Sequence, residues 1–174
     1  MIDNRMTFFK NIELGAGCGN FGKLFFSPCC LTDKNKELKI ACDICHLDCF
    51  CDACELPFGE NTFGIAILCN PYGYGFNTKE ETEILLNELT RVLTDDSRII
   101  IIGNHRNKYC TPKRIEKRIH QISLQGVNIH FTVKETDSAC PYMGYPFLTT
   151  DGRKTNPNKE ITLYVRKQFN TGLD

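Results

Sequence analysis

This 174-residue sequence lacks a net charge, because 21 lysine and arginine residues are balanced by 21 aspartate and glutamate residues. The balance excludes a uniformly basic surface and a global electrostatic preference for nucleic acid, although a local basic patch stays compatible with it. The sequence also lacks a long hydrophobic run, since apolar stretches such as Ile99–Ile102 are far too short to span a bilayer. We therefore expect no membrane partner.

The first ten residues lack the apolar core of a secretory signal peptide, and the chain lacks internal repeats and low-complexity segments. We therefore expect a cytoplasmic protein with a single domain over residues 1–174, which is long enough for a hydrophobic core. The eleven cysteines are an odd number without an export signal. This favours reduced thiols that pack as small hydrophobic groups over a disulfide framework.

Apolar runs alternate with amphipathic segments along the chain, which is typical of an α/β fold. Strands are expected at residues 8–14, 29–32, 46–51, 63–69, 98–103, 127–134 and 161–167, helices at 21–26, 78–93 and 112–125, and a long loop at 135–160. Five strands end in a polar residue, namely Glu13, Asp33, Asp52, Asn70 and Asn104. Because ligands lie across the carboxyl ends of the strands in open α/β sheets, these residues predict a binding site at one edge.

The run of residues 11–22 is the most specific local signal. Glu13 closes a short apolar stretch, Gly15, Gly17 and Gly19 follow at alternate positions, and Gly22 comes three residues later. Glycine lets the backbone turn tightly and approach a ligand without an intervening Cβ. A strand that ends in such a turn and then opens a helix indicates a nucleotide-binding corner.

Four blocks of sequence together resemble the class I S-adenosylmethionine-dependent methyltransferases, and among them a small-molecule type with an Asp-Ala-x-x-Leu-Pro-Phe motif. The blocks are Glu13–Gly19, Leu31–Asp33, Asp52–Phe58 with Asn61–Phe63, and Leu86–Leu93 with Ser97–Ile100. The resemblance spans residues 8–104 and implies one Rossmann-like domain. It also implies a mostly parallel seven-stranded sheet with an antiparallel hairpin at one edge.

The resemblance implies S-adenosyl-L-methionine as the cofactor and transfer of its methyl group to a small-molecule acceptor. The backbone of Gly15, Ala16 and Gly17 would pass beside the methionine moiety. Glu13 would orient that turn and the amino group, and Asp33 would accept hydrogen bonds from both ribose hydroxyls.

The resemblance also implies the residues of the remaining cofactor contacts. Asp52 would accept a hydrogen bond from the adenine amino group, with the backbone of Ala53 at the ring edge. Cys69 and Asn70 would lie near the sulfonium.

Three departures from the family pattern concern the surroundings of this site. Gly64 replaces an aspartate, and Asp95-Asp96-Ser97 replaces a Pro-Gly-Gly turn. The chain is also short before its first strand, where most relatives carry helices that help to cover the substrate.

The aromatic loop 140–147 is one replacement for this cover, and packing of that loop over the sheet edge is the alternative. A homodimer or a partner subunit is another source of cover, and a non-catalytic cofactor-binding subunit stays an alternative function.

Asn70-Pro71-Tyr72 resembles part of the Asn-Pro-Pro-Tyr motif of amino-methyltransferases that act on adenine or glutamine. In those enzymes the asparagine side chain and a proline carbonyl accept hydrogen bonds from the target amine, and the aromatic ring stacks on it. Asn70 and Tyr72 are therefore candidate catalytic residues, and N-methylation of nucleic acid or protein is the alternative activity. His105 is a candidate general base, because imidazole titrates near neutrality, or else a surface histidine.

Two further clusters have a structural and a functional interpretation. The cysteines of segment 42–54 have the spacing of a metal site, with Cys42, Cys45 and His46 as the ligands. We expect no metal, because Cys49 and Cys51 fall inside a predicted strand. The basic residues of segment 113–118 either form the solvent-exposed face of a helix or bind phosphate groups of a ligand. We expect them to form the solvent-exposed face.

Overall fold

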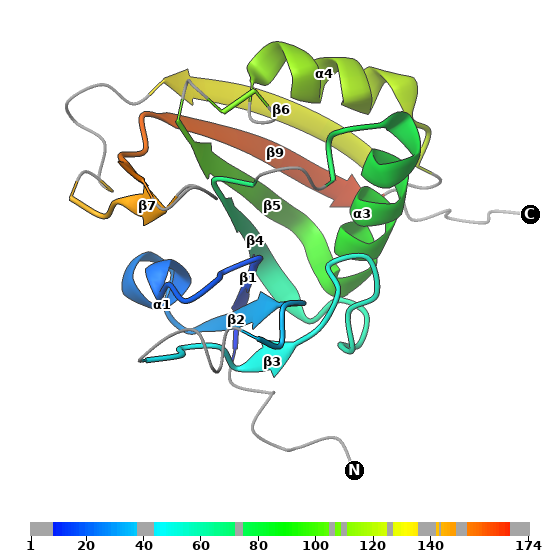
Figure 1. Cartoon of the computed structure of the whole chain (residues 1–174). Helices are drawn as coiled ribbons and strands as arrows, with labels where there is room; N and C mark the ends of the chain where they lie inside the picture. The colour runs from blue at the N-terminus through cyan, green and yellow to red at the C-terminus, as the bar shows by residue number, and fades with distance from the viewer. Residues whose placement is uncertain are drawn as a thin grey trace, which may run out of the picture.

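The computed structural model describes residues 9–37, 44–71, 75–104, 107–108, 111–124, 127–135, 142, 144–148 and 153–167. A seven-stranded sheet runs through the centre of the molecule, and its strands lie in the order β3-β2-β1-β4-β5-β9-β6 (Figure 1). Their bounds are β1 Asn11–Leu14, β2 Cys29–Asp33, β3 Cys49–Phe50, β4 Phe63–Cys69, β5 Leu93–Gly103, β6 Val127–Glu135 and β9 Lys159–Lys167.

The first five strands of the chain are parallel, whereas β9 runs antiparallel to both of its neighbours, β5 and β6. This arrangement confirms the predicted α/β fold with a mostly parallel sheet and an antiparallel hairpin at one edge. Two short strands, β7 Phe147–Leu148 and β8 Lys154–Thr155, form a separate pair within the segment that was predicted to be a loop.

β4 and β5 are the most buried strands, because the sheet is covered on both faces at this point. Ala66, Ile67 and Leu68 of β4 are fully buried, and Ile99–Ile102 of β5 are at most 5% exposed. A parallel strand that is covered on both faces needs apolar side chains at consecutive positions. The apolar runs of the sequence therefore identified both strands, and β4 has the predicted bounds.

Two hydrophobic clusters lie on opposite faces of the sheet. The larger joins one face to α3 (Lys79–Val92) and α4 (Pro112–Gln121) through residues such as Leu85, Leu89 and Ile115. The smaller joins the other face to α1 (Phe21–Phe25) and to aromatic residues that come much later in the chain, Tyr142 and Phe147. Figure 1 shows α1 beside β1 and β2, and α3 and α4 beside the other half of the sheet.

α3 begins where the sequence predicted, because the Thr78 hydroxyl accepts a hydrogen bond from the amide of Glu81. Glu88 is the one polar residue in its apolar stripe, and the structure explains it. The Glu88 carboxylate pairs with Arg91 at 2.7 Å and accepts a hydrogen bond from the amide of Leu56 at 2.6 Å. Arg91 in turn donates to the carbonyls of Leu56 and Phe58. This pair therefore ties the Leu56–Phe58 loop to α3.

β1 begins at Asn11 instead of residue 8, and the predicted bounds of β3, β5 and α4 were wrong for reasons that the structure shows. β3 has two residues instead of six, because the amide of Leu31 pairs with the Asp48 carboxylate at 3.0 Å in place of a backbone carbonyl. β5 begins at Leu93, directly after α3, so that the predicted turn 94–97 belongs to the strand, with Asp96 left-handed at φ 51°. α4 ends at Gln121, because Ile122 is extended and packs against the larger cluster.

Candidate functional site

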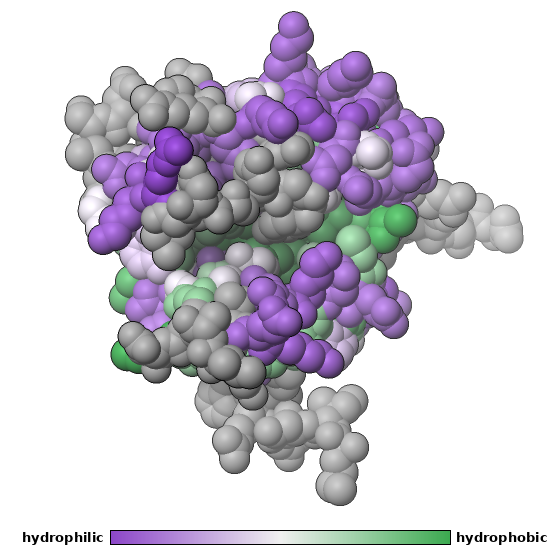
Figure 2. Space-filling model, viewed as in Figure 1, coloured by the Kyte–Doolittle hydropathy of each residue, from purple (hydrophilic) through white to green (hydrophobic). Residues whose placement is uncertain are grey.

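One large cavity opens at the carboxyl ends of β1, β2 and β4. Its volume is about 710 Å³, within the range of roughly 300–1,000 Å³ that small-ligand sites occupy. Hydrophobic residues show at the bottom of a hollow between two hydrophilic rims in the space-filling view (Figure 2). The lining includes all nine positions predicted to contact the cofactor: Glu13, Gly15, Ala16, Gly17, Asp33, Asp52, Ala53, Cys69 and Asn70.

The structure describes only part of the predicted catalytic set. Asn70 lines the cavity, whereas Tyr72 and His105 lie outside the described residues. Asn104, the polar end of β5, does not line the cavity, because its side chain donates to the carbonyl of Asn156 at 2.7 Å. Four of the five polar strand ends therefore meet at this site.

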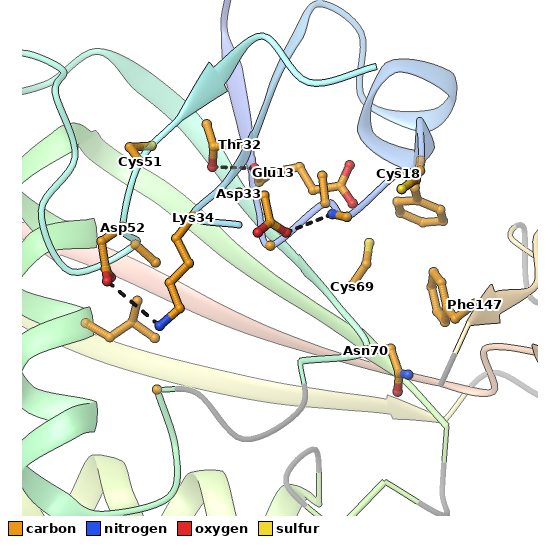
Figure 3. A pocket seen from close by; sticks show the side chains of 18 of the residues that line it. Glu13, Cys18, Thr32, Asp33, Lys34, Cys51, Asp52, Cys69, Asn70 and Phe147 are labelled. Carbon is orange, nitrogen blue, oxygen red and sulfur yellow. Dashed lines mark hydrogen bonds and ion pairs between the residues drawn. The ribbon is translucent and has the colours of Figure 1, made fainter. Parts of the chain in front are cut away.

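The glycine turn after β1 has the conformation that only glycine adopts easily. Gly15 and Gly17 are left-handed, with φ of 65° and 59°. The amide of Gly17 donates to the Asp33 carboxylate at 3.0 Å (Figure 3). The amide of Ala16 donates to the carbonyl of Thr32 at 2.9 Å. These bonds join the turn to the end of β2, so that the acidic residue and the turn form one rigid corner.

Glu13 lies under this turn and is 1% exposed. Its carboxylate accepts a hydrogen bond from the amide of Gly22 at 2.6 Å, and the Cys69 side chain is a second partner. Burial raises the pKa of Glu13 to about 7, and these two hydrogen bonds oppose the rise. The group therefore carries a proton in part of the molecules at neutral pH, and a cationic ligand group beside it would favour its ionised form.

Gly22 is required for this contact. A Cβ at position 22 would lie 2.7 Å from the Glu13 carboxylate and 2.6 Å from the sulfur of Cys29. α1 therefore approaches β1 and β2 as closely as it does because residue 22 has no side chain. The sequence showed this glycine as the last of the run, but not this reason for it.

Asp52 lies at the opposite end of the cavity, after β3. Its carboxylate accepts a hydrogen bond from the amide of Cys54 at 2.9 Å and lies 3.9 Å from the ammonium group of Lys34 (Figure 3). Both side chains are at least half exposed, so this ion pair adds little stability. Lys34 was not among the predicted site residues, and its only signal in the sequence is its place directly after Asp33.

Asn70 reverses the chain after β4 in a left-handed conformation, with φ of 45°. The side chains of Cys69 and Asn70 point in opposite directions, Cys69 toward Glu13 and Asn70 away from it (Figure 3). The Nδ2 atom of Asn107 donates to the Oδ1 atom of Asn70 and to the carbonyl of Pro71, in both cases at 2.9 Å. The two acceptors that the sequence analysis named therefore converge on one NH₂ group.

The aromatic loop closes one side of the cavity with Tyr145, Pro146 and Phe147. The Tyr145 hydroxyl accepts a hydrogen bond from the amide of Asn20 at 2.9 Å, and its ring packs edge-on against Phe21. Tyr142 does not line the cavity, because it is buried and donates to Glu160 at 2.9 Å. One part of the loop thus covers the cavity while another packs in the core.

Solved structures of methyltransferases share this architecture. A Thermotoga maritima protein, described as an S-adenosylmethionine-dependent methyltransferase and a possible histamine N-methyltransferase, aligns over 91% of this chain and 82% of its own, with a TM-score of 0.57 and 14% identity. An S-adenosylmethionine-dependent methyltransferase from Mesorhizobium loti aligns over 91% of each chain, with a TM-score of 0.53 and 12% identity. The fold is the class I methyltransferase fold.

A protein described as "the putative methyltransferase", solved in complex with the Haloferax volcanii Trm112 methyltransferase activator, aligns over 93% of this chain and 83% of its own. Its TM-score is 0.55 at 13% identity. No family model and no curated protein matches the sequence. At these identities the comparisons establish the fold, and the role of each residue rests on the site itself.

The cysteines near the cavity form no metal site in the described part of the chain. Among those residues, no group of three or more His, Cys, Asp or Glu side chains is placed to hold an ion. Cys42, one of the considered ligands, lies outside the described residues. Burial raises the pKa of Cys30 and Cys51 to about 12, which keeps these thiols protonated. The expectation of reduced thiols fails at Cys18, which is disulfide-bonded.

The basic helix α4 is only partly the solvated face that we expected. Arg114 donates to the carbonyls of Phe76 and Asn77 at 2.8 and 2.9 Å, and Arg118 also donates to the carbonyl of Asn77. These arginines hold the segment before α3 and are not free for phosphate. None of the helices in the described residues is long and apolar enough to cross a bilayer.

Proposed function

We propose that this protein is an S-adenosylmethionine-dependent methyltransferase with a small-molecule acceptor. The observation that carries the proposal is the convergence of all nine expected cofactor positions on one cavity in a methyltransferase fold. The donor set suits the cofactor chemically. Asp33 offers a carboxylate to paired hydroxyls, and Glu13 offers a buried carboxylate to a cationic amino group.

Bound S-adenosylmethionine would supply an electrophilic methyl group on its sulfonium. The protein then has to hold donor and acceptor in line, which requires positioning more than acid–base chemistry. Figure 3 shows Phe147 on the opposite side of Cys69 from Asp33 and Asp52. We assign the Asp52 end to the adenine and the Phe147 end to the acceptor, where aromatic side chains exclude water.

A small acceptor fits the walls at the Phe147 end. Tyr145, Pro146 and Phe147 present apolar surface to the cavity, and Asn70 supplies a polar group at the same end. The arginines of α4 that would favour a nucleic-acid substrate pair with backbone carbonyls instead. An apolar or aromatic small molecule with one polar group is therefore the acceptor that these residues favour.

N-methylation of an amino or carboxamide group is the second candidate, and one observation favours it. The Oδ1 atom of Asn70 and the carbonyl of Pro71 each lie 2.9 Å from the same NH₂ nitrogen, that of Asn107. Two acceptors in this arrangement are suited to the two hydrogens of a planar NH₂ group. A hydroxyl acceptor could satisfy only one of them.

Titration calorimetry with S-adenosylmethionine tests the proposal. We expect binding by the wild type and a loss of at least about tenfold in affinity for Asp33→Asn and for Asp52→Asn, since each loses a charge-assisted hydrogen bond. Glu60→Gln, at an exposed site outside the cavity, is the matched control and should bind as the wild type does. A folded wild type that does not bind would refute the proposal. Binding without release of S-adenosylhomocysteine in the presence of amine and alcohol acceptors would indicate a non-catalytic subunit.

A further inference from the structure

The strongest unassigned feature is Asn107, which comes four residues after the end of β5. Asn107 is 8% exposed, and its backbone amide donates to the carbonyl of Asn104 at 2.8 Å. The amide of Asn70, at the end of the neighbouring strand β4, donates to the carbonyl of Ile102 at 2.6 Å. The pairing of the two strands therefore fixes where Asn107 and Asn70 meet.

The contact between them uses both hydrogens of the Asn107 NH₂ group, one on each acceptor. A planar NH₂ group has two hydrogens, and that of Asn107 is within 2.9 Å of both the Asn70 Oδ1 atom and the Pro71 carbonyl. Pro71 is buried, whereas Asn70 lines the cavity. Asn70 therefore brings the pair to the cavity wall, and Pro71 and Asn107, which do not line the cavity, complete the contact next to it.

We propose that Asn107 is a specificity-determining residue that occupies the place of a ligand's planar NH₂ group and has to leave before a carboxamide or aromatic amine can enter. The inference rests on the proposed methyltransferase function for its meaning, but the binding event does not require the cofactor. A tethered carboxamide competes at the high effective concentration of an intramolecular group. Free amides and ammonia are therefore excluded, and only a ligand that gains further contacts in the cavity displaces Asn107.

The competing explanation is that Asn107 is a latch, that is, a purely structural residue that holds the chain at Asn70 and Pro71 in place. The two roles predict opposite effects of shortening the side chain. If Asn107 is a competitor, Asn107→Ala removes the competing donor from Asn70 and Pro71 and strengthens the binding of a ligand that carries NH₂. If it is a latch, the same change loosens Asn70 and Pro71 and weakens that binding.

Benzamide and acetophenone are the matched probes, because they differ only in NH₂ against CH₃. We expect Asn107→Ala to bind benzamide at least about tenfold more tightly than the wild type does, because the competing NH₂ donor is gone. Acetophenone should bind the two proteins equally. Asn107→Leu, which fills the space without donating, should show no gain, and Asn70→Ala combined with Asn107→Ala should lose it.

Each titration is run with and without saturating S-adenosylhomocysteine, and binding of that product is measured first. Absence of product binding refutes the proposed function, whereas the benzamide comparison in the cofactor-free protein still decides the role of Asn107. Equal or weaker benzamide binding by a folded Asn107→Ala protein overturns the inference.

A measurement on the wild type covers the case in which the variant does not fold. The side-chain ¹⁵NH₂ signals of Asn107, assigned by their absence from the spectrum of Asn107→Asp, should shift when benzamide is added and stay in place when acetophenone is added. Bound benzamide that leaves these signals unchanged also overturns the inference.

Discussion

The carboxylate of Glu13 and the backbone amide of Gly22 form a buried hydrogen bond of 2.6 Å between β1 and α1. This bond lies under the glycine turn and fixes the distance between the first strand and the first helix. The pKa of Glu13 is nevertheless raised to about 7, because burial costs the ionised carboxylate more than the bond returns.

Replacement of Glu13 by Gln should remove a pH dependence of stability. In the unfolded chain Glu13 loses its proton near its ordinary pKa of 4.5, whereas the folded protein holds the proton up to about 7. The contribution of Glu13 to the free energy of unfolding is therefore fully present below pH 4.5. It falls by roughly 3 kcal/mol as the pH rises to 7. Glu13→Gln should keep the acceptor for Gly22 and exceed the wild type in stability at pH 8.

Urea unfolding at pH 5 and pH 8 checks this prediction. The difference between the two pH values should shrink in Glu13→Gln but not in the exposed control Glu60→Gln. A Glu13→Gln protein with the pH dependence of the wild type would show that Glu13 titrates normally.

Gly22→Ala should destabilise the protein, because the added methyl group overlaps with neighbouring side chains. The added Cβ would lie 2.6 Å from the Cys29 sulfur, and overpacking of this kind costs about 1–3 kcal/mol. Gly17→Ala should cost about 1 kcal/mol for a different reason, since nothing lies near its Cβ but its φ is 59°. Gly59→Ala is the control, because its nearest neighbour is 3.7 Å away.

Thermal unfolding of the three glycine variants ranks these costs. We expect Gly22→Ala to unfold at the lowest temperature and Gly59→Ala to resemble the wild type. A Gly22→Ala protein as stable as Gly59→Ala would mean that α1 moves away from β1 at no cost.

Arg91→Lys should loosen the adenine end of the cavity. A lysine keeps the charge beside Glu88 but loses the planar fork that reaches the carbonyls of Leu56 and Phe58. We expect a loss of about 1–3 kcal/mol in stability and faster proteolysis within residues 52–60. Arg166→Lys, in an exposed pair with Asp96, should change stability by less than about 1 kcal/mol. Equal effects of the two changes would contradict the role of Arg91.

The two tyrosines of the aromatic loop should separate acceptor binding from stability. Tyr145 lines the cavity and should lose acceptor affinity when it is replaced by Ala, with cofactor affinity retained. Tyr142 is buried and touches Glu160 instead, so Tyr142→Ala should lower the unfolding temperature without a specific effect on acceptor KM. Steady-state kinetics on the folded variants distinguishes the two, and the reverse pattern would place Tyr142 at the acceptor site.

The parts of the fold that sequence alone predicted are those with local causes. The apolar run of β4, the cap and acidic first turn of α3, and the glycines that need positive φ depend on neighbours in the chain. The positions around the cavity followed from the same logic, because strand ends in a parallel sheet meet at one edge.

The parts that sequence did not predict depend on contacts between distant segments. β3 is short because the Asp48 side chain takes a backbone partner on β2. Glu88 interrupts an apolar stripe because it binds a loop 32 residues away. Asn107 carried no motif at all, and only the pairing of β4 with β5 brings it to Asn70.

The position of β9 has a consequence for synthesis of the chain. β9 is the last of the described strands in sequence, yet it lies between β5 and β6. While a ribosome is still translating the segment before residue 159, β5 exposes a row of unpaired backbone amides and carbonyls along a very apolar strand. Such an edge attracts other extended chains. The nascent protein is therefore most in need of chaperone protection in the interval between emergence of β5 and emergence of β9.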